Sequence, residues 1–155
     1  MNAAHLHLFI THLPLCGVGL AALLLAWGAK LQSEDLKKAS LWLLLLMAVL
    51  TAPAYLSGDT AFQLVKSAPG VTRELVEQHE EVAALAAGGM AVLGVVALVG
   101  LVLFRGKNIV PGWFATLTLG VAIIAAGLLA WTSNLGGKIH HPEIRDPSAT
   151  TNLHV

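Results

Sequence analysis

Four long apolar segments constrain the fold of this chain most strongly. They run from Phe9 to Ala29, from Ala39 to Leu56, from about Val82 to Phe104 and from Trp113 to Thr132. Each is close to the roughly 20 residues that a helix needs to cross a bilayer core. Together with a hydrophobic content of 56% and only 12% charged residues, they predict an all-α integral membrane protein. Its four transmembrane helices should form an up-down-up-down bundle.

These segments and their connectors make up one predicted transmembrane domain, residues 1–141, followed by a polar C-terminal tail, residues 142–155. Pro53 is expected to kink or end the second crossing near the membrane surface. Thr72 is a suitable N-cap, which predicts a helix from Arg73 to Phe104. At 1.5 Å per residue this helix would be about 48 Å long, so its first turns should project beyond a bilayer core of about 30 Å.

Positive charges are divided unevenly between the two sides of the predicted bundle. An even number of crossings places both termini on one side. Two short connectors on the other side carry five basic residues: Lys30, Lys37, Lys38, Arg105 and Lys107. The longer segments of the terminal side carry four: Lys66, Arg73, Lys138 and Arg145. Because short cytoplasmic loops are enriched in Lys and Arg, this pattern predicts cytoplasmic connectors and periplasmic termini in a bacterial inner membrane.

Charge and motifs exclude several functions. Nine basic and nine acidic side chains give a formal net charge of zero, so the chain lacks the basic surface of a nucleic-acid-binding protein. The sequence contains no nucleotide-binding glycine loop, no Gly-x-Ser-x-Gly and no His-Glu-x-x-His. This favours an electron-transfer or accessory subunit over a self-sufficient enzyme.

Histidines supply the chemistry that the rest of the sequence lacks. On the predicted topology, all seven belong to the periplasmic half: His5, His7, His12, His79, His140, His141 and His154. Imidazole in an apolar setting tends to be a ligand, a proton carrier or a hydrogen-bonded structural group. Polar loops would also contain histidines without any special role. Except for His154 in the tail, however, they gather at the mouths of the first, third and fourth crossings, which predicts a shared site.

Helix geometry selects among these histidines. At 100° per residue, His7 and His12 point about 140° apart on one helix, so one small ion could not easily take both. The first and third crossings lie on a diagonal of the bundle, about 11–14 Å apart when neighbouring axes are 8–10 Å apart. This span suits a planar macrocycle held by two imidazoles, with His12 and His79 as the favoured ligands. A second candidate pair is His7 with His140 or His141.

Other groups near these histidines also bear on the site. His5 and His7 would point to one side in an extended arm, where they could bind copper or zinc. Asp59 and Asn134 lie at the outer ends of the second and fourth crossings. There they could hydrogen-bond the second nitrogen of a ligating histidine or a haem propionate.

The two halves of the chain show a weak internal sequence repeat. A histidine opens each odd crossing, and an aromatic residue followed by small polar residues closes each even one. Tyr55-Leu56-Ser57-Gly58 would then correspond to Trp131-Thr132-Ser133-Asn134. Duplication of a helical hairpin would produce such a pattern, and so would chance.

The opening histidines also resemble a family motif. His7-Leu8-Phe9-Ile10-Thr11-His12-Leu13-Pro14 is similar to the His-Pro-x-x-x-His-Phe-Pro motif of a family of small bacterial four-helix membrane proteins of unknown function, with leucine at the first proline and at the phenylalanine. Ser57-Gly58-Asp59 resembles the family's Thr/Ser-Gly turn, and His79 its histidine at the third crossing. Gly136-Gly137-Lys138-Ile139-His140-His141 resembles its closing Gly-Gly and histidine. The resemblance implies a haem- or metal-binding membrane module in redox contexts.

These observations lead to one expected function and one alternative. The expected function is a b-type cytochrome-like electron-transfer subunit that binds haem b at the periplasmic end of the bundle. It would pass electrons between the quinone pool and a periplasmic redox partner, in the lipid bilayer and together with other membrane subunits or further copies of itself. The alternative is a non-catalytic accessory subunit of a membrane complex, with or without a copper or zinc site.

Overall fold

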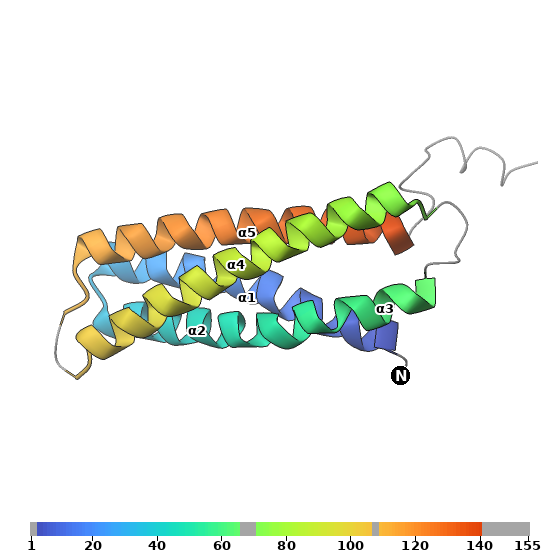
Figure 1. The fold of residues 1–155 in the computed structure, drawn as a ribbon. Coiled ribbons are helices and arrows are strands. Elements are labelled where there is room, and N and C mark those ends of the chain that lie inside the picture. Colours follow the sequence, from blue (N-terminus) through green and yellow to red (C-terminus); the bar gives the residue numbers. More distant parts are fainter. Residues whose placement is uncertain (1–2, 66–70, 107–108, 141–155) are drawn as a thin grey trace, which may run out of the picture.

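The computed structural model describes residues 3–65, 71–106 and 109–140 as a bundle of helices. They are α1 (Ala3–Leu31), α2 (Glu34–Leu56), α3 (Gly58–Val65), α4 (Arg73–Leu103) and α5 (Gly112–His140). The long helices alternate in direction, so the start of α1, the end of α2, α3, the start of α4 and the end of α5 lie at one end of the bundle (Figure 1). All four long helices are long and apolar enough to cross a membrane, which confirms the predicted all-α fold with four helices that could span a bilayer.

Each long helix packs against two neighbours. α1 contacts α2 and α5, and α4 contacts the same two helices. α1 and α4 therefore lie diagonally across the bundle, as predicted. We call the end that holds His7, His12 and His79 the histidine end, and the opposite end, which holds the α1–α2 and α4–α5 connectors, the connector end.

The first residues of α1 differ from one sequence-based expectation. His5 and His7 lie within the helix, which begins at Ala3, and not in an extended arm. The stretch from Ala3 to Leu13 contains neither glycine nor proline, so nothing in it stops the helix from continuing toward the N-terminus. The backbone of the predicted extended arm is therefore helical, and the side chain of His5 lies outside the described residues.

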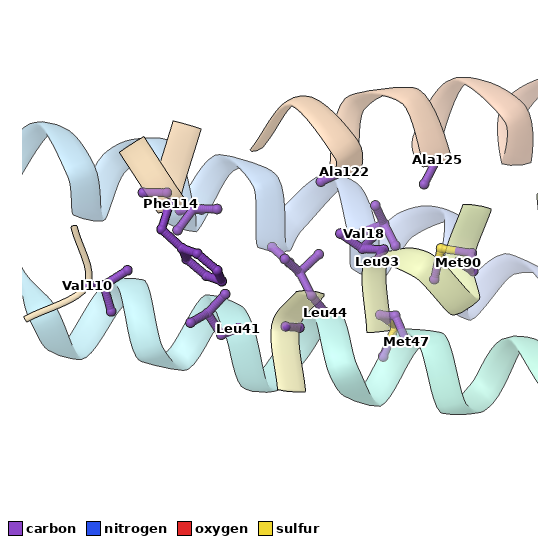
Figure 2. Packing of buried hydrophobic residues seen from close by; sticks show 14 residues of the cluster. Val18, Leu41, Leu44, Met47, Met90, Leu93, Val110, Phe114, Ala122 and Ala125 are labelled. Atoms are coloured by element: carbon purple, nitrogen blue, oxygen red, sulfur yellow. The ribbon is translucent and has the colours of Figure 1, made fainter. Parts of the chain in front are cut away.

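Apolar side chains from the four long helices fill the centre of the bundle (Figure 2). Val18 and Leu93 are fully buried near the middle, and Phe114 packs toward Leu41 closer to the connector end (Figure 2). Gly100 makes room for this ring, because a Cβ there would lie 2.6 Å from Phe114 Cε1. Close packing on small residues is typical of helix contacts inside membranes.

The outer surface carries the pattern of a membrane protein. Large apolar side chains such as Leu23 and Ile124 are more than 60% exposed, at 71% and 66%. Five exposed Trp and Tyr side chains lie toward the helix ends: Trp27, Trp42, Tyr55, Trp113 and Trp131. Because amphipathic rings prefer the membrane interface, this distribution suits a bundle that spans a lipid bilayer.

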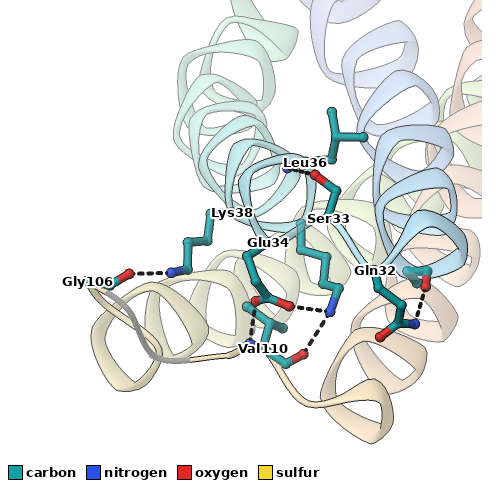
Figure 3. Close-up of polar contacts among 9 residues, drawn as sticks. Gln32, Ser33, Glu34, Leu36, Lys38, Gly106 and Val110 are labelled. Atoms are coloured by element: carbon teal, nitrogen blue, oxygen red, sulfur yellow. Dashed lines mark hydrogen bonds and ion pairs between the residues drawn. The ribbon is translucent and has the colours of Figure 1, made fainter.

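An ion pair in the first turn of α2 contacts the α4–α5 connector at the connector end (Figure 3). Lys37 is 2% exposed, and its Nζ donates to Glu34 Oε1 at 2.6 Å and to the Val110 carbonyl at 3.1 Å. The Val110 N–H in turn donates to Glu34 Oε2 at 2.7 Å. Lys38 Nζ donates to the Gly106 carbonyl at 2.6 Å. The first turn of α2 is thus tied to the α4–α5 connector, and Lys37 is a buried structural group.

Candidate functional site

A cavity of about 530 Å³ lies at the histidine end, and all five helices contribute to its wall. Cofactor and small-molecule sites commonly have volumes of about 300–1,000 Å³. The wall includes three of the predicted ligands, His7, His12 and His79. Much of the remaining wall consists of small residues: Ala54, Gly58, Ala83, Ala86, Ala87, Gly136 and Gly137. Histidines from α1 and from the diagonal helix α4 therefore line one space.

His7 is hydrogen-bonded to the residue that follows α2. Its Nδ1 lies 2.8 Å from Ser57 Oγ. The Ser57 hydroxyl donates its proton to the Ala54 carbonyl at 2.9 Å, so it accepts from the Nδ1–H of His7. In a neutral imidazole protonated at Nδ1, the lone pair that can coordinate a metal is on Nε2.

His79 has the same arrangement on the other side of the bundle. Its Nδ1 lies 3.1 Å from the Thr132 carbonyl oxygen of α5. Because a carbonyl oxygen only accepts, Nδ1 carries the proton, and in the neutral ring the lone pair is then on Nε2. Gly136 leaves space for this ring, since a Cβ there would lie 3.2 Å from His79 Cε1. Histidines that ligate metals usually donate their other N–H to an oxygen in this way, which fixes the ring orientation.

His12 lies at the border of the cavity. Its side chain is exposed, in contrast to the partly buried His7 and His79. It also lines a second, apolar groove on α1 together with Phe9, Leu13 and Cys16. Of the three histidines, His12 is therefore the one that also faces the outer surface of the bundle.

The remaining predicted site residues are placed less centrally or are not described. Asp59 contributes to the cavity wall from the start of α3, whereas Asn134 is exposed on α5 and lies outside that wall. The backbone of His140 ends α5, but its side chain and the whole of His141 lie outside the described residues.

Sequence reasoning missed the two groups that orient the histidines, Ser57 and the Thr132 carbonyl. The weak internal repeat was a signal for both, because Ser57 and Thr132 lie in the repeated sequences at the ends of the second and fourth predicted crossings. A backbone acceptor has no side-chain signature, however, so the role of the Thr132 carbonyl could not be read from residue types.

Similarity to known proteins does not indicate what this cavity binds. Comparison of the chain with known protein families, with curated protein sequences and with solved structures found no match. The likeness of the His7–Pro14 stretch to a family motif therefore stays a resemblance, and function has to be inferred from the cavity itself.

The donors in the cavity suit a macrocycle better than a bare ion. Within residues 3–65, 71–106 and 109–140, no three His, Cys, Asp or Glu side chains come close enough together to hold a metal ion. Protein zinc sites use three or four such ligands. Haem iron needs only axial protein ligands, because the macrocycle supplies the other donors. The cavity therefore offers two oriented imidazoles, from His7 and His79, within a wall rich in small residues.

Proposed function

We propose that the protein is a b-type cytochrome-like membrane subunit that holds haem b in the cavity at the histidine end. The observation that carries this proposal is the placement of His7 and His79 in one cavity, each with its Nδ1–H hydrogen-bonded to oxygen.

The residues of the chain bind and orient the cofactor. Bound haem would supply one-electron chemistry, for which we propose the quinone pool and a periplasmic redox partner as the two exchange partners. The bonds to Ser57 and Thr132 hold the imidazole rings in place. Deeper in the cavity, the buried side chains of Pro14 and Ala86 exclude water and lower the local dielectric constant.

The proposed direction of electron transfer requires the histidine end to face the periplasm. Even without Lys37, which is paired with Glu34, the connector end retains Lys30, Lys38 and Arg105 close to its short connectors. Positive charge in short connectors supports a cytoplasmic location for that end.

Single-cysteine labelling tests this orientation. In a Cys16→Ser background, Glu74→Cys introduces a thiol at the exposed start of α4, and Asp35→Cys introduces one at the exposed start of α2. In intact cells with a permeabilised outer membrane, a membrane-impermeant maleimide should label Glu74→Cys and spare Asp35→Cys until the inner membrane is disrupted. The reverse pattern would contradict the proposed orientation, and neither substitution alters a basic residue.

An absorption spectrum tests the proposed cofactor. Protein purified from haem-replete cells should show a Soret band and, after reduction, an alpha band. His79→Ala should weaken both bands, because it removes a proposed axial ligand. A colourless wild-type preparation contradicts the proposal, and stoichiometric copper or zinc in that preparation would favour a metal-binding accessory subunit instead.

A further inference from the structure

The buried faces of α1 and α4 repeat each other in sequence register. When the sequences of α1 and α4 are aligned so that His7 is paired with His79, buried residues of the two helices also fall at paired positions. The aligned pairs are Pro14 with Ala86, Val18 with Met90, Ala21 with Leu93, and Leu25 with Ala97, and all eight residues are buried. One difference in residue number therefore relates both the two histidines and the buried core positions. The core positions determine which face of each helix points inward.

The packing of the bundle has the same internal symmetry. α1 pairs with α2 as α4 pairs with α5, and the two helix pairs are joined by the α2–α4 and α1–α5 contacts. A half-turn about the bundle axis would therefore exchange α1 with α4 and α2 with α5. This rotation keeps both histidines at the histidine end, on opposite walls of the cavity.

Each histidine also bonds through Nδ1 to an oxygen of its own helix pair, a side-chain hydroxyl for His7 and a backbone carbonyl for His79. His7 donates to Ser57, which is 50 residues further along the chain, and His79 donates to Thr132, which is 53 residues further along. Ser57 directly follows α2 and Thr132 lies within α5, so each acceptor comes from the second helix of its pair. His12 breaks the pattern, because the offset that joins His7 to His79 aligns it with Ala84.

We propose that His7 and His79 are a symmetry-related pair of ligands that would hold one haem per chain, and that His12 is not a ligand. This inference rests on the proposed function and adds to it the identity of the ligands and the stoichiometry. Ser57 acts as a positioning residue for His7, and the Thr132 carbonyl does the same for His79.

Three alanine variants of the full chain test the ligand pair. His7→Ala and His79→Ala should each lose the low-spin spectrum of an iron with two imidazole ligands, and added imidazole should restore it in protein that remains monodisperse. His12→Ala should keep the wild-type spectrum and one haem per chain. If His12→Ala loses the low-spin spectrum while His7→Ala keeps it, the ligand assignment is overturned although the proposed function stands. If the wild-type protein contains no haem, both are overturned.

Substitution of Ser57 tests the positioning role separately from haem binding. Ser57→Ala should leave the haem content unchanged and raise the reduction potential, because an imidazole whose N–H has lost its acceptor is a weaker donor to ferric iron. Ser57→Thr keeps the hydroxyl and should return the potential to the wild-type value. An unchanged potential in Ser57→Ala would show that Ser57 does not position a ligand.

Discussion

Replacement of Lys37 by methionine should lower the free energy of unfolding by about 3 kcal/mol, since removing one partner of a buried ion pair typically costs 3–5 kcal/mol. The lower end of that range applies because the Glu34 side chain is 28% exposed and can regain some hydration. Methionine fills a similar volume, so the loss reflects the missing ammonium group more than a cavity. Unfolding by a denaturing detergent in mixed micelles, followed by tryptophan fluorescence, measures this change.

Lys38 provides a matched control for this prediction. It is the next residue of α2 and also donates to a carbonyl of the α4–α5 connector, but this bond is exposed. Lys38→Met should therefore change the free energy of unfolding by no more than about 0.5 kcal/mol. Adding Glu34→Gln to Lys37→Met should recover a large part of the loss, because it removes the uncompensated carboxylate and keeps an acceptor for the Val110 N–H. Equal losses in the two lysine variants would show that the buried pair has no special role.

The fold was predictable because it follows from hydropathy and helix-end signals. Thr72 was expected to cap a long helix, and its side chain accepts from the Leu75 N–H at 3.2 Å at the start of α4. That helix ends at Leu103, within one residue of the prediction, and is about 46 Å long at 1.5 Å per residue. Local signals of this kind do not depend on the tertiary structure.

The burial of Lys37 was not predictable in the same way. In the sequence it belongs to a charged stretch beside a short connector, which is typical of a cytoplasmic loop. Its acceptors include the Val110 carbonyl, which is 73 residues away along the chain. Only the packing of the α4–α5 connector against the first turn of α2 shows that this lysine is structural.

The sequence indicated at which end of the bundle the candidate site lies, but not which histidine of α1 faces inward. The spacing of His7 and His12 indicated that the two rings point in different directions. Which of them turns inward depends on the rotation of α1 about its own axis. Because this helix is apolar nearly all round, no hydrophobic stripe marks its inner face. The buried positions Pro14, Val18 and Ala21 fix that rotation and place His7 on the inner face, so His7 and not the sequence-predicted His12 is the proposed ligand on α1.

Replacement of Gly137 by leucine should block the cavity and weaken haem binding strongly. Gly137 lies in the cavity wall, and a Cβ added there meets no atom within 4 Å. A leucine side chain can therefore occupy the cavity without disturbing the helices, but a bound group would have to displace it. Overpacking typically costs about 1–3 kcal/mol, which corresponds to an affinity about 5- to 150-fold weaker. Titration of apoprotein with haemin, followed at the Soret band, measures the loss.

Gly127→Leu is the control that separates a filled cavity from a perturbed helix. Gly127 lies in the same helix α5, a Cβ there also meets no atom within 4 Å, and the residue is exposed and outside the cavity wall. Both substitutions replace a helical glycine by a good helix former, so each should stabilise α5 slightly. A protein that binds haem in this cavity should lose affinity only in Gly137→Leu. Equal affinities in the two variants would place the haem elsewhere, even if the wild-type protein is coloured.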